Sequence, residues 1–171
     1  MSLLLVNTAT LWACSAIGWE NPVRTFRPGF ELCVVVRDAN EDKVAPAIVR
    51  NGQSLLVQLP ALLSSSDLKR VRAVTKSSWY LLSGNHRSST LLLQLKAAAV
   101  VSFRAALDRV ISRGDRIAIL LNGEGVGVLM FNHPLTEDEI AIDASFFSDG
   151  TQKEKEAATH DLAERIKSTL Y

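Results

Sequence analysis

The sequence predicts an α+β fold, in which helices pack on a mostly antiparallel sheet built from hairpins. Three observations predict this class. Two pairs of apolar runs are separated by short segments that contain Asn-Gly, which is typical of hairpin turns. Three other segments repeat their apolar residues at helical spacing. The chain of 171 residues is 47% apolar and 22% charged, which suits a single globular domain spanning residues 1–171.

Three strands are expected before the first hairpin. Residues 2–6 and 11–17 are short apolar runs, and residues 30–37 are rich in β-branched and aromatic side chains. Gly and Pro punctuate residues 18–29, and this composition favours a loop. The loop therefore separates the first two strands from the third.

The first hairpin is expected at residues 47–59. Asn51 and Gly52 supply the two positive φ angles of a tight type I′ turn between residues 47–50 and 54–59. Such a turn joins neighbouring antiparallel strands directly.

A second hairpin and one further strand are expected closer to the C-terminus. Residues 122–125 join apolar runs at 116–121 and 126–131. Residues 139–147 alternate between apolar and polar side chains, which indicates a strand with one face in water. Because the strands come in hairpins, we expect an antiparallel sheet.

The first of two central helices is expected at about residues 66–76. Ser and Asp occupy positions 64–67, and both residue types cap helix N-termini. At about 100° per residue, Leu68, Val71 and Thr75 fall on one side of such a helix. That side would pack on the sheet.

The second central helix is expected to be long, from about residue 89 to 113. Gly114 is a residue type that ends helices. Apolar side chains surround most of the first three turns, and Lys96 falls near the middle of the apolar face. A helix that is apolar nearly all round needs cover on both sides, from the sheet and from another layer or subunit.

A C-terminal helix is expected at about residues 152–170. Thr151 and Glu154 have the spacing of a capping box, which marks a helix start. Behind it, apolar residues recur every fourth position and form one narrow stripe. The stripe predicts that this helix packs on the sheet along one side.

Charge is segregated along the chain, although the net charge is only +1. Residues 1–116 contain 15 basic and 8 acidic residues, a net charge of +7, whereas residues 117–171 contain 4 basic and 10 acidic residues, a net charge of −6. Ten of the basic residues lie within residues 69–116. Segregated charge indicates an anionic partner, an acidic tail region or self-association through opposite patches, or else the two parts neutralise each other within one fold.

The sequence therefore predicts a non-enzymatic interaction or assembly protein that self-associates as a homo-oligomer. Its basic central surface, residues 69–116, would contact nucleic acid, such as RNA, or an acidic protein. No catalytic signature is readable, so the sequence leans away from an enzyme. The residues expected to bind an anion or nucleic acid are Arg70, Arg72, Lys76, Arg87, Arg104, Arg109 and Arg113.

The alternative is a small enzyme or small-molecule binder. Its pocket would lie between the sheet and the long helix, with Lys96, His133 or Trp19 at its mouth. A lysine on an apolar helix face is a nucleophile of lowered pKa, the single cation in an apolar pocket, or a residue whose long stem reaches water. All three interpretations stay open on the sequence alone.

No cofactor, metal or membrane is expected. The segment 123–127 has a GxGxG pattern, but a strand-like run follows it where a dinucleotide site needs a helix. No run is long and apolar enough for a membrane span, and the N-terminus lacks a basic signal-peptide region. Cys14 and Cys33 lie in apolar runs, which favours buried thiols and a cytoplasmic location, although they could pair on neighbouring strands.

Overall fold

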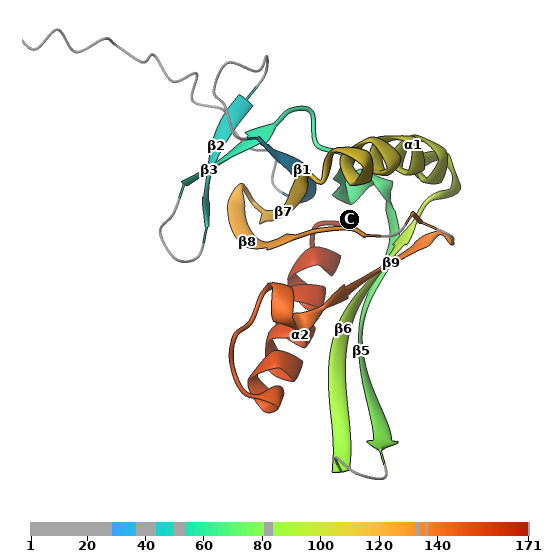
Figure 1. Cartoon of the computed structure of the whole chain (residues 1–171), viewed down its shortest axis with the longest axis vertical. Coiled ribbons are helices and arrows are strands. Elements are labelled where there is room, and N and C mark those ends of the chain that lie inside the picture. The colour runs from blue at the N-terminus through green and yellow to red at the C-terminus, as the bar shows by residue number, and fades with distance from the viewer. Residues whose placement is uncertain are drawn as a thin grey trace, which may run out of the picture.

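The structure confirms an α+β fold, with antiparallel sheets, one central helix and one C-terminal helix (Figure 1). The strands expected at 2–6 and 11–17 lie outside the residues that it describes. It is a computed structural model that describes residues 29–36, 44–49, 54–80, 84–132, 134–135 and 137–170, without the side chains of 44–49, 77–80 and 84–87.

Five strands close into a small barrel. They are β1 (Phe30–Val36), β2 (Val44–Val49), β3 (Ser54–Gln58), β7 (Arg116–Leu121) and β8 (Glu124–Leu129). The pairings run in a ring from β1 through β7, β8, β2 and β3 back to β1. All are antiparallel except that between β2 and β8. The strands of both predicted hairpins are present and pair as expected, and they are four of these five. The turn predicted at Asn51 and Gly52 lies outside the described residues.

Strands β1 and β7 are buried on both faces, which is why their sequences are almost continuously apolar. The side chains on one face of these strands point into the barrel, and those on the other face belong to the main core. The barrel interior contains Cys33, Val35, Val57, Ala118 and Leu120. The side chains that β1 and β7 contribute to the main core are Phe30, Leu32, Val34, Ile117, Ile119 and Leu121.

A second sheet has three antiparallel strands in the order β5-β6-β9. They are β5 (Leu68–Tyr80), β6 (Gly84–Leu95) and β9 (Glu139–Asp143). The two-residue strand β4 (Leu63–Ser64) pairs with β1 and leads the chain from the barrel to β5. In Figure 1, β5 and β6 form a long ribbon that extends away from the barrel.

Two helices cover the sheets. The helix α1 (Ala97–Arg113) buries Phe103, Leu107 and Val110 in the main core, and the Phe103 ring lies 6.5 Å from that of Phe131 in an edge-to-face arrangement. The helix α2 packs against both β5 and β6 (Figure 1). Side chains of the barrel wall, the second sheet and both helices share this one core.

The C-terminal helix is confirmed, as α2 (Gln152–Lys167). Its predicted capping box is present, because the Thr151 N–H donates to Glu154 Oε2 at 2.6 Å and the Glu154 N–H donates to Thr151 Oγ1 at 3.4 Å. The hydrogen bond from the Thr151 backbone, followed by that with its side chain, lowers the pKa of the Glu154 carboxyl group. The charged carboxylate is therefore the form that caps the helix.

The helix predicted at 66–76 is wrong, because residues 68–80 form β5. The Ser and Asp residues that predicted its cap instead close a single 3-10 turn, Ser65–Asp67, where the Ser64 N–H donates to Asp67 Oδ2 at 2.8 Å. From residue 70 to residue 76, three of the four side chains on one strand face are charged and none on the other face is. Pairing along the whole length of β6 stabilises the strand.

The helix predicted at 89–113 is correct only in its later part. Residues 89–95 belong to β6, and the helix begins at Ala97. The run Leu91–Leu93 is apolar on both strand faces and therefore fits either period. Gly114 ends α1 in the left-handed conformation, with φ of 65°, as the sequence predicts.

Candidate functional site

The second sheet has one covered and one open face. On the face toward α2, Val71 of β5, Leu93 of β6 and Ile140 of β9 lie in register and are buried. The opposite face, called the outer face below, carries the alternate residues of each strand. Side chains there are exposed or half-buried, so this face is open to solvent in the described part of the chain.

Three exposed cations share the outer face of β5. Arg70, Arg72 and Lys76 pair with Gln94, Leu92 and Ser88 of β6, which places all three on the same side of the sheet. We call these three residues the basic row. All three belong to the set predicted from the sequence to bind an anion.

Two members of the basic row have no ion-pair partner in the described part of the chain. Arg72 donates to Glu139 of β9 at 2.8 Å, across the intervening β6, and the two side chains are 48% and 26% exposed. Arg70 and Lys76 form no ion pair with any residue that the structure describes. An exposed pair such as that of Arg72 contributes little stability, so a competing carboxylate could displace Glu139 at little cost.

The outer face is electrically asymmetric. The basic row lies on β5, whereas β9 places Glu139 and Asp143 on the same face. Strands β5 and β9 are two strand spacings apart, about 10 Å, which is comparable to the screening length at physiological salt. A ligand along β5 therefore experiences mainly the positive row, and one that spans the sheet meets both signs.

The other predicted anion-binding residues do not join the basic row. Arg104, Arg109 and Arg113 are exposed on α1, at one end of the ribbon (Figure 1). Arg87 pairs with Ser77 in the β5–β6 ladder, and its side chain lies outside the described part of the structure. The predicted surface is thus divided between a strand and a helix.

Of the three residues of the alternative pocket, the structure describes only Lys96. Lys96 is exposed between β6 and α1, where its Nζ donates to the Ser66 carbonyl at 2.7 Å. Its expected place on the apolar face of a helix is wrong, because α1 begins only at Ala97. His133 and Trp19 lie outside the described residues. Between α1 and the barrel, buried core side chains fill the space.

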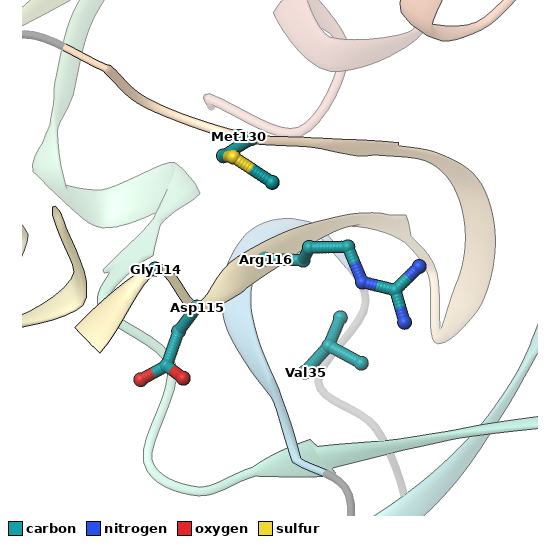
Figure 2. A pocket seen from close by; sticks show the side chains of 5 residues that line it. All are labelled: Val35, Gly114, Asp115, Arg116 and Met130. Carbon is teal, nitrogen blue, oxygen red and sulfur yellow. The ribbon is translucent and has the colours of Figure 1, made fainter.

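A shallow pocket lies where α1 turns into β7. It has a volume of about 80 Å³ and is lined by Val35, Gly114, Asp115, Arg116 and Met130. Figure 2 shows the charged ends of Asp115 and Arg116 pointing in different directions. Sites for small molecules usually measure about 300 Å³ or more, so this hollow is too small for one.

The barrel interior holds one buried carboxyl group. Glu31 is 8% exposed, and its Oε2 has no hydrogen-bond partner among the described residues. A single carboxyl group supplies neither an acid–base pair nor a metal site. In the described part of the chain, no three His, Cys, Asp or Glu side chains are grouped so that they could hold a metal ion.

The sequence alone did not reveal the open side of β5. A helical period over residues 70–76 places Arg70 and Lys76 away from the apolar stripe and Arg72 beside that stripe. A period of two places Arg70, Arg72 and Lys76 on one face, and this alternation was the signal that could have found the row. Glu139, which pairs with Arg72, carried no recognisable signal, because the contact joins distant strands.

Comparisons with known proteins give a fold similarity. No protein-family model and no curated protein matches the chain. It is similar to a crystal structure of SecDF in its super-membrane-facing form, with a TM-score of 0.52 and 16% identity, over 82% of this chain and 19% of that one. A second SecDF structure, described as a membrane component that enhances protein export, gives a TM-score of 0.48 and 18% identity, over 82% of this chain and 63% of that one. At such identities, the first similarity shows a shared fold alone.

The chain therefore spans less than two thirds of the length of either SecDF chain. Among the described helices, none is long and apolar enough to cross a membrane.

Proposed function

We propose that this is a non-enzymatic interaction protein that binds an acidic segment of a partner protein on the basic row. The observation that carries the proposal is the alignment of three exposed cations on one face of β5, two of them without an ion pair among the described residues. Carboxylates placed along the row would neutralise this charge.

The charge pattern favours a protein segment over a nucleic acid. Strand β9 lies about 10 Å from β5 and carries Asp143 and Glu139, of which Glu139 reaches across to pair with Arg72 at 2.8 Å. Both carboxylates repel a polyanion wide enough to span the sheet. The arginines of α1 lie on another element and do not lengthen the row. A ligand as narrow as one strand gains the attraction of β5 and avoids the repulsion of β9.

The binding test is fluorescence anisotropy with a labelled acidic peptide and the whole protein. Reversing two charges of the row, Arg70→Glu with Lys76→Glu, is expected to weaken binding by at least about tenfold. The matched control reverses two charges on α1, Arg109→Glu with Arg113→Glu, and is expected to change the affinity by less than about threefold.

Two results would contradict the proposal. Equal losses for the two double variants would mean that only net charge matters. Single-stranded RNA that binds more tightly than the peptide at the same ionic strength would favour a nucleic-acid partner. The affinity for the peptide is expected to fall as the salt concentration rises, because salt screens the exposed charges of the basic row.

A second candidate function, self-association, rests on a separate observation on α1. Val101 is 76% exposed, and Ala98 and Ala105 are exposed beside it on the side away from the core. Their spacing of three and four residues places them on one helix face. Such an apolar stripe on a helix is a surface that a second copy of the chain can cover.

Light scattering over a range of concentrations tests self-association. The native chain is expected to exceed its monomer mass of 18.7 kDa as concentration rises, whereas Val101→Glu stays at that mass. Ser112→Glu, at an already polar exposed site of α1, is the control and is expected to behave like the native chain. A native chain that is monomeric at every concentration would exclude this candidate. The cytoplasmic location and the pocket function expected from the sequence stay predictions.

A further inference from the structure

Strand β5 lies at the edge of the described three-stranded sheet along its whole length. Its 13 residues pair with β6 from Leu68↔Leu95 to Tyr80↔Gly84, and no described strand pairs with its other side. An unpaired edge presents alternating N–H and C=O groups that can pair with another chain.

The hydrogen bonds of β6 identify which groups of β5 point to this edge. The Leu95 N–H donates to the Asp138 carbonyl on the β9 side at 2.8 Å, and the Lys96 N–H donates to the Asp67 carbonyl on the β5 side at 2.8 Å. Because successive residues of a strand direct their backbone groups to opposite sides, the even-numbered residues of β6 bond to β5.

The register then divides β5 into two sets. Arg70, Arg72 and Val74 stand opposite even-numbered residues of β6, so their N–H and C=O groups bond inside the sheet. The backbone groups of Val71, Ala73 and Thr75 therefore point to the open edge. One ligand can therefore bind the backbone groups of Val71, Ala73 and Thr75 and, at the same time, the cationic side chains of the basic row.

We infer that the acidic partner binds as an added strand at the edge of β5; this rests on the proposed function and specifies its geometry. The added backbone pairs with Val71, Ala73 and Thr75. Every second side chain of the added strand then lies on the outer face, about 5 Å from the basic row.

This geometry defines a sequence pattern for the partner. The partner needs two acidic residues that are two positions apart and lie opposite Arg70 and Arg72. It needs a third acidic residue opposite Lys76, four positions from the one opposite Arg72. The position between faces the half-buried Val74 and suits an apolar or β-branched side chain. The ligand class is therefore an extended peptide with acidic residues in a period of two.

Two labelled peptides of about ten residues test the pattern. One, the alternating peptide, has Glu at the outer-face positions opposite Arg70, Arg72 and Lys76, Val opposite Val74, and Thr or Val at the positions between, and the other has the same composition with its Glu residues in one block. The alternating peptide is expected to bind at least about tenfold more tightly, because only it can place each carboxylate beside the row. Equal affinities would overturn the inference.

A proline at the open edge tests the backbone pairing. Thr75→Pro removes an N–H that points away from β6, so the sheet keeps its own bonds, and the peptide is expected to bind about tenfold more weakly. Thr75→Val keeps this N–H and removes the hydroxyl, which lies 3.4 Å from Ser89 Oγ, and is the matched control expected to bind like the native chain.

A modified peptide gives the same test without changing the protein. N-methyl groups on alternate residues of the alternating peptide block pairing in one register set and leave the other set free. One methylated form is expected to lose binding by about tenfold, and the form methylated at the other positions is expected to keep it. Binding by both forms would contradict strand addition even if Thr75→Pro unfolds the sheet.

The outcomes separate the inference from the proposed function. Loss of binding in Arg70→Glu with Lys76→Glu, together with normal binding in Thr75→Pro and by both methylated peptides, would retain an acidic partner and reject an added strand. Normal binding in the charge-reversed protein would reject both.

Discussion

The barrel and the three-stranded sheet use their strands differently. In the barrel, each of the five strands pairs on both sides, because the ring closes from β3 back to β1. In the second sheet, β5 pairs on one side only among the described strands, and one face of the sheet is open. A closed ring has no unpaired strand edge. An edge strand has one, and another chain can pair with it.

The side chains of the two regions follow from this difference. Strands β1 and β7 are apolar on both faces because both are buried. Strand β5 alternates, with Val71 buried and Arg72 exposed, because only one of its faces meets the core. The barrel strands are thus used for the buried core, whereas the edge and outer face of β5 are where we propose that a partner binds.

The largest expected effect is truncation inside the barrel. Leu120 is fully buried there, so Leu120→Ala is expected to lower the free energy of unfolding by about 3 kcal/mol. Leu92, half-buried on the outer face, is the control, and Leu92→Ala is expected to cost about 1 kcal/mol. Urea denaturation measures both, and equal losses would break the distinction between the two regions.

The next effect concerns the contact between the regions. Gly127 lies in β8, and a Cβ at this position would overlap the carbonyl oxygen of Phe146, which follows β9. Gly127→Ala is expected to cost about 2 kcal/mol in thermal or urea unfolding, because backbone must move. In Gly114→Ala the added Cβ lies within 4 Å of no other atom, and only the positive φ of 65° is unfavourable. This change is therefore expected to lower the free energy of unfolding by about 1 kcal/mol. The reverse order would contradict this close approach.

A smaller effect is expected at the start of α2, which covers the inner face of the second sheet. Thr151→Ala removes the side chain that accepts from the Glu154 N–H and is expected to cost about 1 kcal/mol in urea unfolding. Ser168→Ala, at the exposed opposite end of the helix, is the control expected to change little. An equal effect at both ends would argue against the capping box.

The same cap predicts a dependence on pH. The pKa of Glu154 is lowered in the folded chain from its ordinary value of 4.5, so its contribution to stability is present above pH 4.5 and is lost as the pH falls through the lowered pKa. Glu154→Gln is expected to lose this part of the acid dependence. Urea unfolding of both proteins between neutral and acidic pH measures it, and identical pH profiles would contradict a charged cap.

The smallest expected effect on stability is at the basic row. Arg72→Ala breaks the exposed ion pair with Glu139 and is expected to change the free energy of unfolding by less than about 0.5 kcal/mol. The same change is expected to weaken peptide binding by several-fold, which anisotropy measures. A large loss of stability with normal binding would assign Arg72 to the fold and not to the partner.

Local signals in the sequence predicted a large part of the fold. Strand β1, both hairpins, the end of α1 at Gly114 and the capping box of α2 each depend on residues close together in the chain. Strand β5 was missed because its identity depends on pairing with β6. The caps at 64–67 and the run Leu91–Leu93 fitted helices equally well by themselves.

The candidate site was predicted as a set of residues but not as an arrangement. Charge counting selected Arg70, Arg72 and Lys76, and also arginines that α1 carries elsewhere. Which cations share a face depends on whether the local period is two or 3.6, and the sequence around Val71 and Thr75 did not decide between them. The open edge could not be predicted, since an edge is defined by the strand order of a folded sheet.

Amide hydrogen exchange along β5, measured by NMR with and without the alternating acidic peptide, tests the central claim most directly. In the free protein, we expect the amides of Arg72 and Val74 to be protected by β6 and those of Ala73 and Thr75 to exchange quickly. Bound peptide should slow exchange at Ala73 and Thr75. Saturating peptide that leaves both amides as fast as before, or that protects α1 instead, would show that the edge of β5 is not the binding site.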